Sequence, residues 1–174
     1  AGAQVCTGGA YWCMDNRELQ FSTVDIGGIS GFRFRDGPRG LSEWEEETNA
    51  SRKATAFPAS IARAATFDLG TEYAIAAAIC TEALASGWNN VLAPTVNLTM
   101  HPTAGRAQES YGEDPWHNGK MGSAFVIGCQ QFAQACPKHY VANEVETARV
   151  TMNATMDERT LREQYARAFE MIIE

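Results

Sequence analysis

Strand-like and helix-like segments alternate along this sequence of 174 residues, and their order limits the possible folds more than any other feature. Three short apolar runs are predicted strands, and a longer helical segment follows each one. The predicted strands are 31–35, 90–98 and 135–141, and the helical segments are 58–87, 114–131 and the stretch after 157. Repeated units of this kind imply a parallel sheet with right-handed crossovers. The chain is therefore predicted to be an α/β protein.

Local signals mark the ends of the helical segments. Asp68 and Asp157 stand where helix N-caps belong, and Asp114 is followed by proline at the first helical position. Gly87 stands where a C-terminal cap belongs, so the first segment is one or two helices. The last helix has an apolar face at helical spacing, formed by Leu161, Tyr165, Phe169 and Ile172.

Strand–helix order alone does not separate a (β/α) barrel from an open, doubly wound sheet. No G-x-G-x-x-G lies at a strand–helix junction and no P-loop occurs, which favours the barrel. Three strand–helix units are well short of the roughly eight that close such a barrel. We expect residues 1–174 to form the N-terminal part of one barrel domain, with no second domain in this chain. An unrelated doubly wound α/β domain is the alternative.

Charge and composition exclude several partners. The net charge is −7 and the isoelectric point about 5.0, which argues against nucleic acid or an anionic membrane surface as a partner. No apolar run approaches the roughly 20 residues of a membrane helix. The spacings of cysteine and histidine match no zinc pattern, so neither a metal nor a cofactor is expected.

Cysteines and glycosylation sequons bear on the compartment. An odd number of cysteines leaves at least one thiol without an internal partner; they are Cys6, Cys13, Cys80, Cys129 and Cys136. Cys6 and Cys13 are close enough in sequence for a bridge in an exported protein, and free thiols are the alternative. Asn-x-Ser/Thr sequons occur at Asn49, Asn97 and Asn153. They favour a secreted or periplasmic location over a cytoplasmic one.

Polar side chains gather where the predicted strands end. Asp36 follows the first strand, Arg106 and Glu109 lie beyond the second, and the third contains Lys138 and His139. Carboxyl ends of parallel strands meet at one edge, and such side chains suit a neutral polyhydroxyl ligand, because carboxylates accept from hydroxyls while cations donate to them. Taken singly, Asp36 could be a turn former, and Arg106 with Glu109 a structural ion pair.

Aromatic side chains that could stack on a pyranose ring are also present, although core packing is the commoner role of any one of them. They are Trp44, Trp88, Trp116 and Tyr111.

The third cluster belongs to a longer motif. Residues 138–146 read Lys-His-Tyr-Val-Ala-Asn-Glu-Val-Glu, with Arg149 beyond, which closely resembles the Lys-His-Phe-x-x-Asn-x-x-Glu segment of glycoside hydrolase family 3. Other landmarks of that family's N-terminal domain follow the same order. They are Asp-Gly-Pro-Arg-Gly at 36–40, Phe-Pro at 57–58, Gly-Arg at 105–106 with Glu109, Gly-Glu-Asp-Pro at 112–115 and the helix 157–163.

The resemblance implies a fold, an activity and a set of site residues. The fold would be the first three strand–helix units of a (β/α)8 TIM-like barrel, and the activity retaining hydrolysis of terminal β-glucosyl residues from β-glucosides or oligosaccharides. The glycone, the sugar before the scissile bond, would be held by Asp36, Arg106, Lys138 and His139. A supporting shell would comprise Glu109, Asn143, Glu144 and Arg149. The sequence at 140–144 departs from the Phe-Pro-Gly-His-Gly of the N-acetylglucosaminidase branch.

The resemblance also indicates what this chain lacks. In the family, the nucleophile is an aspartate in a downstream Ser-Asp-Trp-like segment, and the acid/base is a glutamate in a later domain. No Ser-Asp-Trp occurs here, so no catalytic residue is expected in this chain, and its partner would be the remaining part of the same enzyme. The isolated chain is then predicted to be inactive. The alternative is a catalytically inactive carbohydrate-binding or regulatory module derived from the same fold.

Overall fold

The structure is a computed structural model that describes residues 31–42 and 53–174. Several predictions concern other residues. The Cys6–Cys13 bridge, the Trp44 stacking surface and the sequon at Asn49 lie outside the described residues.

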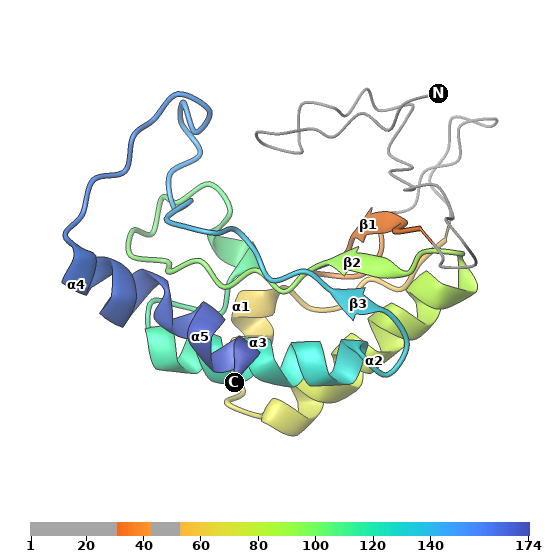
Figure 1. Ribbon diagram of the computed structural model, residues 1–174. Helices are drawn as coiled ribbons and strands as arrows, with labels where there is room; N and C mark the ends of the chain where they lie inside the picture. The colour runs from red at the N-terminus through yellow and green to blue at the C-terminus, as the bar shows by residue number, and fades with distance from the viewer. Residues whose placement is uncertain (1–30, 43–52) are drawn as a thin grey trace.

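Three parallel strands form the sheet, in the order β1-β2-β3. They are β1 (Phe34–Asp36), β2 (Asn90–Leu92) and β3 (Gln134–Ala135). The helices α2 (Leu69–Ala85) and α3 (Pro115–Cys129) run along one face of this sheet (Figure 1). The α/β class with a parallel sheet is therefore confirmed.

All three strands are shorter than the predicted runs, and in β2 and β3 a proline explains the early end of the strand. Pro94 follows β2 closely and Pro137 follows β3, and each lacks the backbone N–H that a continuing ladder needs. The chain stays extended beyond both, with single bridges between Thr95 and Lys138 and between Leu98 and Gly112. The first bridge keeps the segments after β2 and β3 side by side, which brings their polar residues together, and the second joins the segment after β2 to the residues before α3.

Asp36 is the last residue of β1, one position beyond the predicted strand. It pairs in register with Leu92 of β2, so its backbone belongs to the sheet. The prediction ended the strand at residue 35, which was wrong by one residue at the site itself. The strand position fixes the direction in which the Asp36 carboxylate leaves the sheet.

The helical segment 58–87 is two helices, α1 (Ser60–Ala64) and α2. Asp68 caps α2, since its carboxylate accepts a hydrogen bond from the Gly70 amide at 2.9 Å. Gly87 lies just past the helix with φ of +88°, the left-handed conformation that glycine adopts without steric cost. Both predicted caps of this segment are confirmed.

The other two predicted caps are confirmed as well. Asp114 accepts from the amide of His117 at 2.6 Å at the start of α3, and Asp157 accepts from the amide of Thr160 at 2.7 Å. The last helix is less regular than its apolar spacing predicts. It consists of α4 (Glu158–Thr160), a π-helical turn (Leu161–Tyr165) and α5 (Arg167–Ile173).

The core lies between α2, α3 and the sheet. Ile79, Val91 and Phe125 are fully buried there, and a disulfide joins Cys80 of α2 to Cys129 of α3. The helices approach closely at Gly128, where an added Cβ would lie 2.3 Å from the Tyr73 carbonyl oxygen. No helix in the described ranges is long and apolar enough to cross a membrane.

Candidate functional site

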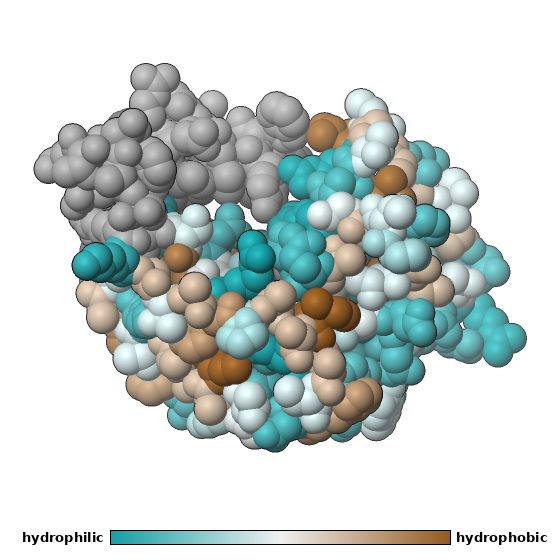
Figure 2. All heavy atoms as spheres, turned by 180° about the vertical axis from the view of Figure 1, so that it is seen from behind, coloured by the Kyte–Doolittle hydropathy of each residue, from teal (hydrophilic) through white to brown (hydrophobic). Residues whose placement is uncertain are grey.

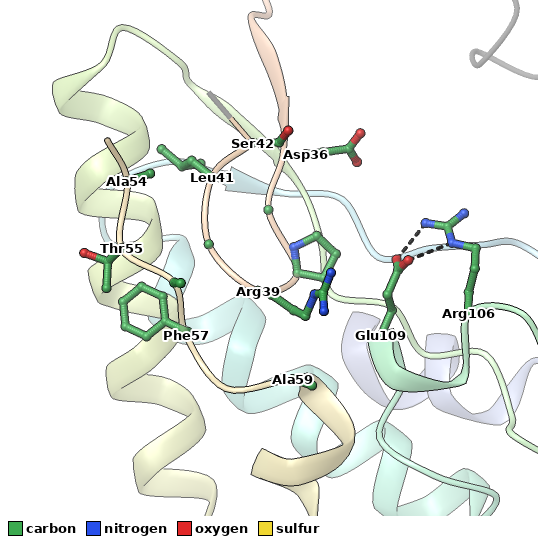
Figure 3. Close-up of a pocket in the computed structure, with 14 residues that line it drawn as sticks. Asp36, Arg39, Leu41, Ser42, Ala54, Thr55, Phe57, Ala59, Arg106 and Glu109 are labelled. Carbon is green, nitrogen blue, oxygen red and sulfur yellow. Dashed lines mark hydrogen bonds and ion pairs between the residues drawn. The ribbon is translucent and has the colours of Figure 1, made fainter. Parts of the chain in front are cut away.

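A pocket of about 580 Å³ lies at the carboxyl end of β1. Its walls come from the loop after β1, the segment before α1 and the 3-10 turn at Ala107–Glu109 (Figure 3). Polar side chains reach it from opposite sides. Those that carry charge are Asp36, Arg39, Arg106 and Glu109.

Asp36 and Lys138 form an ion pair between the first and third strand segments, with 2.8 Å between Nζ and Oδ1. The side chain of Lys138 is 10% exposed and that of Asp36 35% exposed. Asp36 therefore keeps carboxylate surface open to the pocket, while the ammonium group beneath it is almost covered.

Arg106 joins the second strand segment to the third. Its guanidinium makes a two-pronged contact with Glu109, at 2.9 and 2.7 Å, and its Nη1 lies 2.8 Å from Nε2 of His139. The structure thus brings together the residues predicted to hold the glycone, in two linked pairs. Asp36 and Arg106 line the pocket directly, whereas Lys138 and His139 lie behind them.

Asn97 determines the state of His139. The side-chain oxygen of Asn97, Oδ1, accepts from the backbone N–H of His139 at 2.8 Å. The side-chain nitrogen of Asn97, Nδ2, donates to the backbone carbonyl of His139 at 3.2 Å. The same Asn97 oxygen lies 2.8 Å from Nδ1, so Nδ1 carries the proton and Nε2 accepts from Arg106. Burial, with the charges of Arg106 and Lys138, lowers the pKa of His139 to about 3. The imidazole is therefore neutral.

Of the predicted supporting shell, Glu109 lines the pocket and holds Arg106, whereas Asn143 and Arg149 contact Glu146 behind this pair. Glu146 accepts from Asn143 at 3.1 Å and from Arg149 at 2.5 Å, and it lies 3.9 Å from Arg106. The fourth member, Glu144, accepts from the Tyr165 hydroxyl at 3.2 Å, and burial raises its pKa. Asn143 and Glu144 border a small cavity that His139 also lines.

A buried arginine holds the loop that follows Asp36. Arg63 of α1 donates to the Pro38 carbonyl at 3.0 Å and is paired with Glu72 of α2 at 2.7 Å. Glu72 also accepts from the Tyr111 hydroxyl at 2.6 Å, and burial, followed by the charge of Glu72, raises the Tyr111 pKa well above its ordinary value. The pocket wall is thus tied to the two helices beneath it.

Three of the four aromatic residues that could stack on a sugar lie among the described residues, and they pack elsewhere. Tyr111 is in the core, Trp88 lies under the Arg35 guanidinium, and Trp116 lies near Lys120 on α3. None of these three lines the pocket, whose described aromatic wall is Phe57. In the structure these three side chains pack in the core or against neighbouring cations, and they are not placed to stack on a sugar in the pocket.

The prediction missed Asn97. Its position near the end of the predicted strand 90–98 is the signal that could have identified it. Its sequon pointed instead to glycosylation, but the residue is 8% exposed and its amide is hydrogen-bonded to His139. Asn153, by contrast, is exposed.

Comparison with known proteins decides the family. The family described as "Glycosyl hydrolase family 3 N terminal domain" matches residues 43–174, about three quarters of the chain. The chain belongs to glycosyl hydrolase family 3. The match begins after Asp36, which the geometry of β1 brings into the site.

Relatives and solved structures of this family agree. Beta-glucosidase B of Emericella nidulans is 40% identical over 147 residues, which are 84% of this chain and 17% of that protein. Thermostable beta-glucosidase B of Acetivibrio thermocellus is 33% identical across 97% of this chain and 22% of that protein. Beta-glucosidase 3B from Thermotoga neapolitana, solved in complex with alpha-D-glucose, has a TM-score of 0.80 at 36% identity and covers 87% of this chain and 22% of its own. The chain thus spans about a fifth of the length of the relatives it matches.

Among residues 31–42 and 53–174, no group of three or more histidine, cysteine or carboxylate side chains could hold a metal ion.

Proposed function

We propose that this chain supplies the glycone-binding part of a retaining β-glucosidase, as the first three strand–helix units of a (β/α)8 barrel. The observation that carries the proposal is the convergence of Asp36, Arg106, Lys138 and His139 at one end of the sheet. The match to beta-glucosidases over most of this chain, one of them solved with glucose, supports the same reading.

The arrangement suits a sugar with several hydroxyls. The Asp36 carboxylate, paired with Lys138 yet partly open, accepts from two adjacent hydroxyls of the glycone, and Arg106 presents donors beside it. His139 remains neutral, so it orients Arg106 without adding a further positive charge. Each of these groups discriminates, because a sugar that lacks the matching hydroxyl leaves a desolvated polar group unpaired.

Bond cleavage needs two further carboxylates. A retaining mechanism uses a nucleophile and an acid/base about 5 Å apart on either side of the glycosidic bond. Asp36 and Glu109 both face the pocket, and each is committed to a cation, Lys138 and Arg106 respectively. We therefore assign the nucleophile and the acid/base to polypeptide outside this chain, which would also complete the barrel.

The test uses the full-length enzyme that contains this segment, with Asp36→Asn and Lys138→Met. Loss of one charge-assisted contact of about 1.5–3 kcal/mol predicts a fall in kcat/KM on an aryl β-D-glucoside of about 10- to 100-fold for each variant. The matched control is Glu163→Gln, which removes an exposed carboxylate paired with Arg159 far along the last helix. Activity of Asp36→Asn within threefold of the wild type contradicts the proposal.

A further inference from the structure

Arg39 differs from every other charged residue that lines the pocket. Asp36 is paired with Lys138, and Glu109 with Arg106. Arg39 is exposed, and in the described part of the chain its guanidinium makes no hydrogen bond or ion pair. Its side chain points across the pocket toward the side on which Glu109 and Arg106 lie (Figure 3). Among the described residues, Arg39 is therefore the one cation of the pocket lining without an anionic partner.

The backbone around Arg39 is held firmly although the side chain is free. The Pro38 carbonyl accepts from Arg63 at 3.0 Å, and the Arg39 carbonyl accepts from the Phe57 amide at 2.9 Å. Gly40 has φ of +111°, and an added Cβ there would lie 2.1 Å from the Thr55 carbonyl oxygen. A side chain at position 40 does not fit. The backbone of this loop is therefore held in one conformation, which fixes the position of the Arg39 Cα atom.

The position of Arg39 separates it from the glycone grip. Asp36 and Arg106 are paired with the buried Lys138 and the half-buried His139 at the strand ends, whereas Arg39 lines the pocket together with Thr55 and Phe57. A pocket of about 580 Å³ falls in the range that holds drug-sized ligands, so a single glucose leaves part of it unfilled. Of the two arginines that line the pocket, Arg39 is the one that the proposed glycone grip leaves unused.

We infer that Arg39 is a specificity-determining residue for the sugar on the leaving-group side of the bond. Its guanidinium would donate to hydroxyl or ring oxygens of that second sugar, with Phe57 as an apolar surface beside it. The substrate class is then a β-linked glucose disaccharide or oligosaccharide in preference to a glucoside with a small non-sugar leaving group. This inference rests on the proposed β-glucosidase function.

The experiment compares two kinds of substrate on the full-length enzyme. The sugar substrates are β-1,3-, β-1,4- and β-1,6-linked glucose disaccharides, and the reference is 4-nitrophenyl β-D-glucoside. For Arg39→Met, we expect kcat/KM on the preferred disaccharide to fall about 10- to 100-fold, mainly through KM, because a charged donor is lost. On the aryl glucoside the fall should be no more than about threefold. Arg39→Lys keeps the positive charge but lacks the planar guanidinium with its several N–H donors. It should therefore retain more disaccharide activity than Arg39→Met.

Controls separate this inference from simpler outcomes. Arg159→Met removes an exposed arginine of the last helix and should leave both activities unchanged. An equal loss on both substrates, with or without a lower melting temperature, overturns the inference, because Arg39 would then serve the glycone or the fold. Unchanged disaccharide activity in Arg39→Met overturns it too. A wild-type enzyme that cleaves only the aryl glucoside overturns the inference but not the proposed function, whereas one that cleaves no β-glucoside overturns the proposed function itself.

Discussion

At the scale of single residues, His139 shows how the site controls its own charge. Its Nδ1 proton is directed at Asn97, and its Nε2 lone pair is directed at Arg106. A second proton on the ring would place an N–H against the Arg106 guanidinium. The low pKa of about 3, caused by burial and by Arg106 and Lys138, follows from this arrangement. Arg106 can then present its remaining donors without repulsion from a charged neighbour.

Stability should depend on pH through His139. The folded pKa of about 3 lies below the unfolded value of 6.5, so the unfolded chain binds more protons between these values and stability rises with pH. The contribution is complete above pH 6.5 and is lost as the pH falls toward 3. Urea unfolding at pH 4 and pH 7 should therefore show that His139→Gln weakens this dependence, by roughly 2 kcal/mol after allowance for partial exposure. Parallel pH profiles of wild type and variant would contradict this assignment.

At the scale of elements, sequence predicted the helices better than the strands. A helix cap depends on neighbours a few residues away, which is why Asp68, Asp114 and Asp157 could each be identified in advance. Strand length depends on a ladder with distant partners. The predicted strands followed the apolar runs and therefore included Pro94 and Pro137. Proline lacks the backbone N–H that the ladder needs, so the strands end before these residues.

The same distinction applies to the site. The positions of the strand ends and the order of the motifs were enough to predict Asp36, Arg106, Lys138 and His139 as site residues, because parallel strands place their carboxyl ends together. Asn97 could not be chosen in this way, because its role depends on the backbone of His139, which is 42 residues away. The pairing of Cys80 with Cys129 likewise depends on how α2 packs on α3.

The disulfide between α2 and α3 should contribute measurably to stability. It closes a loop with a sequence separation of 49 residues, so replacing Cys80 and Cys129 together by alanine should lower the free energy of unfolding by about 2–4 kcal/mol. Urea unfolding with and without reductant measures this, and the double variant should lose the part of the reductant effect that the Cys80–Cys129 bridge contributes. Cys136→Ser is the matched control, since Cys136 is the unpaired cysteine among the described residues. A wild-type protein that is insensitive to reductant contradicts the prediction.

At the scale of the whole molecule, apolar exposure is uneven. On the face seen in Figure 2, apolar side chains lie scattered among hydrophilic ones. The segment between β3 and α4 exposes several large apolar side chains, namely Tyr140, Val145, Val150 and Met152. Exposed apolar surface is typical of regions that contact other protein. It supports the proposal that further polypeptide of the same enzyme packs beside the third strand segment.

The isolated 174-residue chain should therefore not turn over an aryl β-D-glucoside, even at high concentration. The reason is chemical as well as structural, because the described carboxylates that line the pocket, Asp36 and Glu109, are each paired with a cation and are assigned to holding the sugar and Arg106, not to attack or proton transfer. The assay is release of the aryl alcohol, with the full-length enzyme as the positive control and the melting transition of the isolated chain as the check that it is folded. Addition of the remaining polypeptide should restore turnover if the two pieces assemble. Turnover by the isolated chain that Asp36→Ala abolishes would contradict the prediction, since it would assign Asp36 to catalysis instead of to holding the sugar.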